Sequence, residues 1–284
     1  MKTTRAVDKV LKSRPTTEGA GVRLKRAFGP AEASLLDPFL LLDDFHSANP
    51  DDYLVGFPFH PHRGIETVTY VIRGVIEHRD TIGNKGVINS GDVQWMTAGS
   101  GILHQEMPQR YDGMMQGFQL WVNLPASMKM IKPRYREVKS HQIPSISPSD
   151  GVQVKVIAGR LEGQEGPIRD LVVKVEYLDV AIQPHKVFSH QVKRDNSALA
   201  YVFEGDGFFD PENAGPVKTE HLVIFKKGDV VDIKAGEKGI RFLLVSGMPI
   251  REPIAWGGPI VMNTQEELDL AFKELQEGEF IKNG

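Results

Sequence analysis

Histidine and acidic residues recur at two-residue spacing in two short segments of the chain. One proline separates His60 from His62, and one glutamine separates His104 from Glu106. Because alternate side chains of a β-strand lie on the same face, each pair would point to one side of its strand. Two such pairs facing each other would bring four nitrogen and oxygen donors together. This donor set suits Fe(II), Mn(II), Ni(II), Cu(II) or Zn(II), and a six-coordinate ion would keep two positions for water, substrate or dioxygen.

Glu66 is a fifth candidate donor, because it would share the face of His60 and His62 in a regular strand. It could be a metal ligand, a partner that orients a histidine, or a residue that faces solvent, and the spacing leaves these alternatives open. An isolated His-x-His pair is more often an ordinary polar pair than a site. The clustering of both pairs in one part of the chain favours the metal site.

Composition narrows the classes of protein that could use such a site. The 284 residues are 40% hydrophobic and 25% charged, as in globular proteins, and 28 glycines and 18 prolines favour many turns between short strands. The absence of cysteine excludes disulfides, thiolate metal sites, iron–sulfur clusters and cysteine nucleophiles. The net charge of −3, with no block of basic residues, disfavours direct nucleic-acid binding. No long apolar stretch indicates a leader or a membrane span, so we expect a soluble cytoplasmic protein.

Hydrophobic periodicity favours β-structure for most of the chain. Alternation at residues 66–72, 154–157, 171–177 and 222–225, bounded by turn-forming residues, predicts short strands in a sandwich or barrel. One helix is expected at the C-terminus, where Thr264 and Glu267 have the spacing of a capping box ahead of apolar residues at helical spacing: Leu268, Ala271, Phe272 and Leu275.

Two segments repeat and predict an internal duplication. Residues 70–74 (YVIRG) resemble 201–205 (YVFEG), and a Gly-Asp-Val…Ala-Gly pattern occurs at both 91–99 and 228–236. We therefore expect a first domain at residues 1–131, a linker rich in proline, serine and charge at 132–150, and a second domain with the terminal helix at 151–284.

The second copy lacks the donors of the first. The repeat aligns the four first-copy donors with Gln191, Lys193, Arg241 and Leu243. Lysine and arginine are not ordinary metal ligands while protonated, so the second domain is expected to bind no metal and to serve as structure or meet a partner. His185 and His190 lie out of register and are interpreted as polar loop residues.

Longer strings around these residues resemble the pirin family of the cupin superfamily. The resemblance covers nearly the whole chain and is most specific in the first domain. The matching strings are LLDPFLLLDDF at 35–45, HPHRGIETV at 60–68, GDVQWMTAG at 91–99, GILHQEM at 101–107, LWVNLP at 120–125 and GPIVMNT at 258–264. Thr97, where many cupins carry proline, and the extra acid Glu106 both separate this chain from generic cupins.

The resemblance implies an all-β bicupin, with two antiparallel β-barrel (jelly-roll) domains and a short C-terminal helix. It implies one mononuclear iron site in the N-terminal barrel, most simply Fe(II). The ligands that the family pattern places on this sequence are His60, His62, His104 and Glu106, and Glu66 is not among them.

The resemblance also implies two different functions. Pirins are similar to quercetin 2,3-dioxygenases, which favours an Fe(II)-dependent oxidoreductase that cleaves a flavonol-like aromatic with dioxygen. Glu106, or metal-bound hydroxide, would take the substrate's proton. The alternative is an iron-dependent regulatory protein whose second domain or surface meets a protein partner, as described for nuclear members of the family. A third expectation is a redox-silent cupin, such as an isomerase, with Zn or Mn in the same site.

The sequence leaves the nature of the substrate pocket open. Four apolar side chains flank the predicted ligands and could line a pocket or belong to the barrel core: Phe57, Phe59, Trp95 and Met107.

Overall fold

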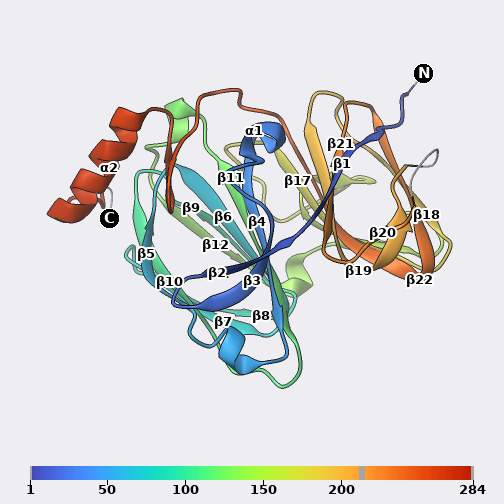
Figure 1. Cartoon of the computed structure of the whole chain (residues 1–284), viewed down its shortest axis with the longest axis horizontal. Helices are drawn as coiled ribbons and strands as arrows, with labels where there is room; N and C mark the ends of the chain where they lie inside the picture. The colour runs from blue at the N-terminus through green and yellow to red at the C-terminus, as the bar shows by residue number, and fades with distance from the viewer. Residues whose placement is uncertain (1, 211–214, 283–284) are drawn as a thin grey trace. The chain divides into compact units, whose positions relative to one another are not determined.

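The computed structural model describes residues 2–210 and 215–282. It consists mainly of antiparallel β-strands, with one longer helix near the C-terminus (Figure 1). The predicted all-β class with a terminal helix is confirmed. No helix in the described part of the chain is long and apolar enough to cross a membrane.

The chain forms two compact units whose boundaries differ from those expected from the sequence. The first unit contains residues 15–34, 38–140 and the chain from 250 onward, and the second contains residues up to 14, 35–37 and 141–249. The C-terminal segment therefore packs with the unit that carries the histidine motifs. Residues 134–138 of the predicted linker form a strand of that same unit.

The first unit has two main antiparallel sheets. The seven-stranded sheet has the order β12-β9-β6-β11-β4-β3-β2, and the four-stranded sheet has the order β5-β10-β7-β8. In chain order these strands are β2 (Arg14–Glu18), β3 (Val22–Phe28), β4 (Phe39–Ser47), β5 (Phe57–His62), β6 (Ile65–Arg73), β7 (Val75–Asp80), β8 (Lys85–Asn89), β9 (Val93–Thr97), β10 (Ile102–Pro108), β11 (Met115–Asn123) and β12 (Arg134–Val138). Short helical turns are α1 (Ala33–Leu36), η1 (Pro50–Asp52), η2 (Ala126–Met128) and η3 (Ser140–Gln142).

The core of the first unit lies between these two sheets. Leu24, Phe45 and Val71 come from the seven-stranded sheet, and Ile76 and Ile88 come from the four-stranded sheet; all belong to one buried cluster. Strand β10 shows why the sequence folds this way, because its residues alternate between fully and partly buried positions. One face of β10 therefore points into the barrel.

The second unit is a nine-stranded antiparallel sheet with an apolar interior. Its main path is β1-β21-β19-β22-β17-β14-β13, with β18 on β22 and β20 on β19. The strands are β1 (Val7–Lys12), β13 (Ser145–Ile146), β14 (Val152–Ala158), β17 (Val175–Ile182), β18 (Val187–Gln191), β19 (Ser197–Phe208), β20 (Val217–Lys218), β21 (His221–Phe225) and β22 (Val230–Gly247), and β15 (Arg160–Leu161) pairs with β16 (Gln164–Glu165).

The interpretation of His190 as a loop residue is wrong. His190 is buried in β18, and its Nε2 lies 2.9 Å from Oε2 of Glu176. Ser246 donates a hydrogen bond of 3.3 Å to the same oxygen. The polar group is tolerated among apolar neighbours because it is hydrogen-bonded.

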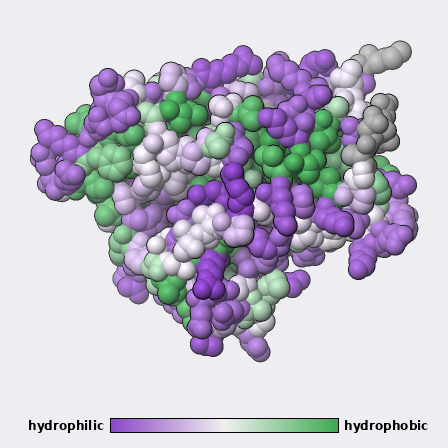
Figure 2. Space-filling view, viewed as in Figure 1, coloured by the Kyte–Doolittle hydropathy of each residue, from purple (hydrophilic) through white to green (hydrophobic). Residues whose placement is uncertain are grey.

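The C-terminal segment contains a short hairpin, β23 (Ala255–Gly257) and β24 (Ile260–Met262), followed by α2 (Gln265–Glu277). The predicted capping box is present: Glu267 N donates to Thr264 Oγ1 at 3.2 Å, and Thr264 N donates to Glu267 Oε2 at 3.1 Å. Leu268 and Ala271 are buried on one face of the helix, while the outer surface seen in Figure 2 is mainly hydrophilic. The helix is therefore amphipathic, as its apolar spacing predicts.

Two buried cations attach this segment to the His60–His62 strand. Arg63 donates 2.7 Å hydrogen bonds to Glu274 Oε2 and to the carbonyl of Phe280. Lys129 donates to the carbonyls of Gly64 and Val261 at 2.9 and 2.8 Å, and to Asn123 Oδ1 at 2.7 Å. The three acceptors match the three donors of an ammonium group.

Replacing Lys129 with Met should destabilise the protein, because two buried carbonyls and one amide oxygen would lose their donor. We expect the free energy of unfolding to fall by roughly 2–4 kcal/mol in urea titrations. Lys132→Met is the matched control, since Lys132 is exposed and its replacement should change stability little. Equal stability of both variants would show that Lys129 does not anchor the segment.

Candidate metal centre

Three of the four predicted ligands converge inside the first unit. His60 and His62 are on β5 and His104 is on the adjacent strand β10, directly opposite His60. One ring nitrogen or more from each side chain lies within 4.8 Å of the others. The ring centroids are 4.3–5.0 Å apart. Among the described residues, this group is the one cluster of three or more histidine or acidic side chains with the spacing of a metal site.

Backbone carbonyls orient the two β5 histidines. Nδ1 of His60 lies 2.9 Å from the carbonyl of Pro58, and Nδ1 of His62 lies 2.9 Å from the carbonyl of Pro259. A carbonyl only accepts, so each Nδ1 must carry the proton. When the ring is neutral, its lone pair is then on Nε2, which is the usual arrangement of a metal-binding histidine.

His104 shows most clearly that this cluster suits a cation. Its side chain is fully buried, and neither ring nitrogen has a hydrogen-bond partner. An unsatisfied buried polar atom is costly and rare, whereas a metal ion would satisfy it. Burial and the neighbouring histidines lower the pKa of His104 well below its usual value. Burial, and secondarily the charge of His60, lowers the pKa of His62 to about 3. Both rings are therefore neutral and able to coordinate at pH 7.

Glu106 lies on the same face of β10 as His104, and it lines a pocket together with His60 and His62. The pairing of β10 with β5 shifts register between these two residues. His104 lies opposite His60, whereas Glu106 lies opposite Phe57. Glu106 Oε1 lies 2.7 Å from Oγ1 of Thr69, which also lies 2.6 Å from the side-chain oxygen position of Gln119. A hydroxyl has one proton, so Thr69 donates to one neighbour and accepts from the other. The carboxylate is not among the three side chains gathered within 4.8 Å.

Glu66 does not share the face of the histidines. The chain turns at Gly64, with φ of +78°, so the alternation in β5 does not continue into β6. An added Cβ at Gly64 would lie 2.0 Å from the carbonyl oxygen of Val261, which makes glycine necessary there. Glu66 instead accepts a 2.6 Å hydrogen bond from Thr97, and burial raises its pKa. The regular strand on which shared parity depends is therefore not present.

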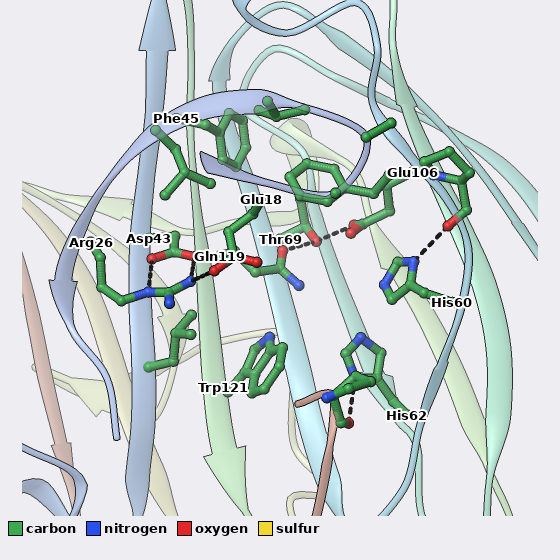
Figure 3. Close-up of a pocket in the computed structure, with 18 of the residues that line it drawn as sticks. Glu18, Arg26, Asp43, Phe45, His60, His62, Thr69, Glu106, Gln119 and Trp121 are labelled. Carbon is green, nitrogen blue, oxygen red and sulfur yellow. Dashed lines mark hydrogen bonds and ion pairs between the residues drawn. The ribbon is translucent and has the colours of Figure 1, made fainter. Parts of the chain in front are cut away.

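His60 and His62 line a large open pocket of about 720 Å³ (Figure 3). Trp121 contacts His62 edge-on at 5.0 Å and stacks with Trp256 at 6.0 Å. Phe57 and Phe59 line the cavity, as one of the two alternatives predicted. Trp95, which is fully buried, and Met107 are not among its lining residues.

Several lining residues were not predicted from the sequence. Trp256 is remote in the chain and reaches the cavity because the C-terminal segment packs with the first unit. Three more lie within strands β6 and β11: Thr69, Gln119 and Trp121. Their alternation with core residues predicts a strand but gives no indication of a binding site. Arg26 and Asp43 form an ion pair across β3 and β4. The Leu-Leu-Asp-Asp-Phe string contains Asp43, but its arginine partner is not evident from spacing.

Comparison with known proteins assigns the family. The family model described as Pirin matches residues 21–122, and the one described as Pirin C-terminal cupin domain matches residues 177–281. The chain belongs to the pirin family. It is 46% identical to a pirin-like protein of Caulobacter vibrioides, over 97% of this chain and 99% of that protein. The predicted resemblance to pirins and cupins is thus confirmed.

Two relatives of this pirin bear the name of an enzyme. It is 40% identical to a Pseudomonas aeruginosa protein with the provisional name quercetin 2,3-dioxygenase, over 93% of this chain and 94% of that one. The crystal structure of a quercetin 2,3-dioxygenase from Acinetobacter baumannii has 31% identity and a TM-score of 0.90, with 98% of each chain covered.

Replacing His62 with Ala should sharply lower the metal content of the purified protein. The wild-type protein should bind one transition-metal ion per chain, and loss of one neutral donor should weaken binding by at least tenfold. Elemental analysis after dialysis against a weak chelator measures the ratio. His141→Ala is the control, because His141 is exposed in η3 and should not affect the metal. Two bound ions, one of which survives His62→Ala, would contradict a single site in the first unit.

Proposed function

We propose that this pirin is an iron-dependent dioxygenase that acts on a flavonol such as quercetin. The observation that carries the proposal is a cluster of three imidazoles, two of them buried, in which His60 and His62 line a pocket that also contains two stacked indole rings. Neutral nitrogen donors suit a divalent transition metal, and indole faces suit a flat aromatic ligand. The names of the Pseudomonas and Acinetobacter relatives support the same reaction class.

In this proposal, His60, His62, His104 and Glu106 hold the iron. Glu106 supplies a carboxylate beside the three imidazole donors, and it shares a strand face with His104. Fe(II) is proposed over Zn(II) because one-electron chemistry with dioxygen requires a redox-active ion, and the family resemblance implies iron. When bound, iron would act as a Lewis acid toward an acidic substrate oxygen and would exchange electrons with dioxygen.

The chain's own groups would bind the substrate and move its proton. A carboxylate oxygen of Glu106 would accept the proton of the substrate's enolic hydroxyl, which makes the aromatic system electron-rich. Thr69 hydrogen-bonds the other carboxylate oxygen and thereby holds the side chain in place. Trp121 and Trp256 would orient the ring plane.

The iron-loaded protein should consume dioxygen when quercetin is added. An oxygen electrode and the loss of flavonol absorbance should report equal rates. If the iron-replete protein consumes no oxygen with any flavonol tested, the dioxygenase proposal is wrong and the regulatory alternative takes its place.

Replacing Glu106 with Gln should reduce turnover per bound iron by roughly 10²- to 10⁴-fold, the usual range for general-base assistance. An amide can still offer an oxygen to a metal, but it cannot accept a proton near neutral pH. Turnover is normalised to measured iron so that metal loss and proton transfer are separated. Glu77→Gln on β7 is the control, because Glu77 does not line the cavity. Full turnover per iron in Glu106→Gln would leave Glu106 as a ligand alone.

A further inference from the structure

The cavity has a second polar end, away from the metal cluster. Figure 3 shows Arg26 and Asp43 at one side of the pocket and His60 and His62 at the other, with Trp121 between them. Everything that lines this cavity belongs to the first unit. A ligand held only through the metal would leave the far end of the space without a partner.

The far end is built from a bidentate ion pair. Arg26 Nε donates to Asp43 Oδ1 and Arg26 Nη2 donates to Asp43 Oδ2, each at 2.8 Å, and Nη2 also lies 2.8 Å from Oε1 of Glu18. Nη1 makes no hydrogen bond to any described residue, although the Arg26 side chain is only 18% exposed. This group therefore keeps two N–H donors for a molecule inside the cavity.

Stability alone does not explain a charged pair at this position. Burial raises the pKa of Asp43 to about 6 even though Arg26 pulls it down, so the carboxylate is held in an unfavourable environment. A buried ion pair commonly stabilises a fold no better than apolar side chains of similar volume. The neighbouring wall residues Val22, Leu24 and Leu41 are apolar, and they would pack well against such a replacement.

We infer that the Arg26–Asp43 pair is a second anchor for the substrate and selects flat aromatic ligands that carry a hydroxyl group remote from the metal-binding oxygen. Arg26 Nη1 donates to the phenolic oxygen, and the phenolic O–H donates to a carboxylate oxygen of Asp43. The indoles of Trp121 and Trp256 hold the plane of the ligand between the two ends. This inference rests on the proposed flavonol function and specifies which flavonols the pocket prefers.

The test compares two ligands that share the metal-binding end. 3-Hydroxyflavone and quercetin have the same enol and carbonyl oxygens, but only quercetin has hydroxyl groups on its outer rings. Dissociation constants are measured without oxygen on the iron-loaded protein, from quenching of tryptophan fluorescence. Wild-type protein should bind quercetin more tightly. The double variant Arg26→Met with Asp43→Leu should lose about tenfold or more in affinity for quercetin and less than about twofold for 3-hydroxyflavone.

Arg23→Met provides a matched control, because Arg23 lies on the same strand with a side chain that is 76% exposed. It should keep the wild-type preference. Arg26→Lys retains the positive charge but not the planar guanidinium group. It should therefore lose part of its affinity for quercetin and keep its affinity for 3-hydroxyflavone. This conservative variant carries the test if the double variant does not fold.

Equal weakening of both ligands, unchanged affinity for both, or no preference in the wild-type protein would overturn the inference. Oxygen uptake is measured separately on the same preparations. A protein that binds quercetin through this pair but consumes no oxygen would contradict the proposed reaction and leave the anchor intact.

Discussion

The first unit depends on the gathering of three imidazole rings at one point, where His62 and His104 are buried and the ring nitrogens of His104 have no partner in the protein. A folded barrel normally pairs every buried polar atom, and His104 has neither ring nitrogen paired. In the neighbouring rings of His60 and His62, the hydrogen bonds are made by Nδ1, so Nε2 is available as a donor to a cation. The barrel thus contains a cluster of nitrogen lone pairs that a cation would stabilise. A bound cation would convert this cost into binding energy and would couple folding to metal binding in this unit.

The end of the chain completes this arrangement. The carbonyl of Pro259 orients His62, Trp256 forms part of the cavity wall, and Lys129 joins the Gly64 turn to Val261. These contacts make the C-terminal segment part of the unit that carries the histidine cluster, although residues 141–249 of the other unit come just before it in sequence. The order of the histidine strand therefore depends on the last elements of the fold. A fragment that ends before residue 250 would lack one of the carbonyls that fix the histidine tautomers.

Sequence reasoning predicts local features well and long-range ones poorly. The capping box at Thr264 and the shared face of His104 and Glu106 depend on residues close in the chain, and both are present. Glu66 would share the face of His60 and His62 only in a regular strand, and Gly64 interrupts the strand with a positive φ. The Arg26–Asp43 pair and the return of Trp256 to the cavity depend on strand pairing and packing across the chain. Hydrophobic periodicity contains no information on such long-range contacts. The resemblance to pirins identified the motifs that contain the predicted metal ligands, but it did not show the pocket around them.

The most direct test of the metal centre is a crystal structure of the iron-loaded protein with diffraction data collected on both sides of the iron absorption edge. The account predicts one anomalous peak per chain, bonded to Nε2 of His60 and His62, to a ring nitrogen of His104 and to a carboxylate oxygen of Glu106, at roughly 2.0–2.3 Å. A peak bonded to Glu66, or one located in the second unit, would contradict it.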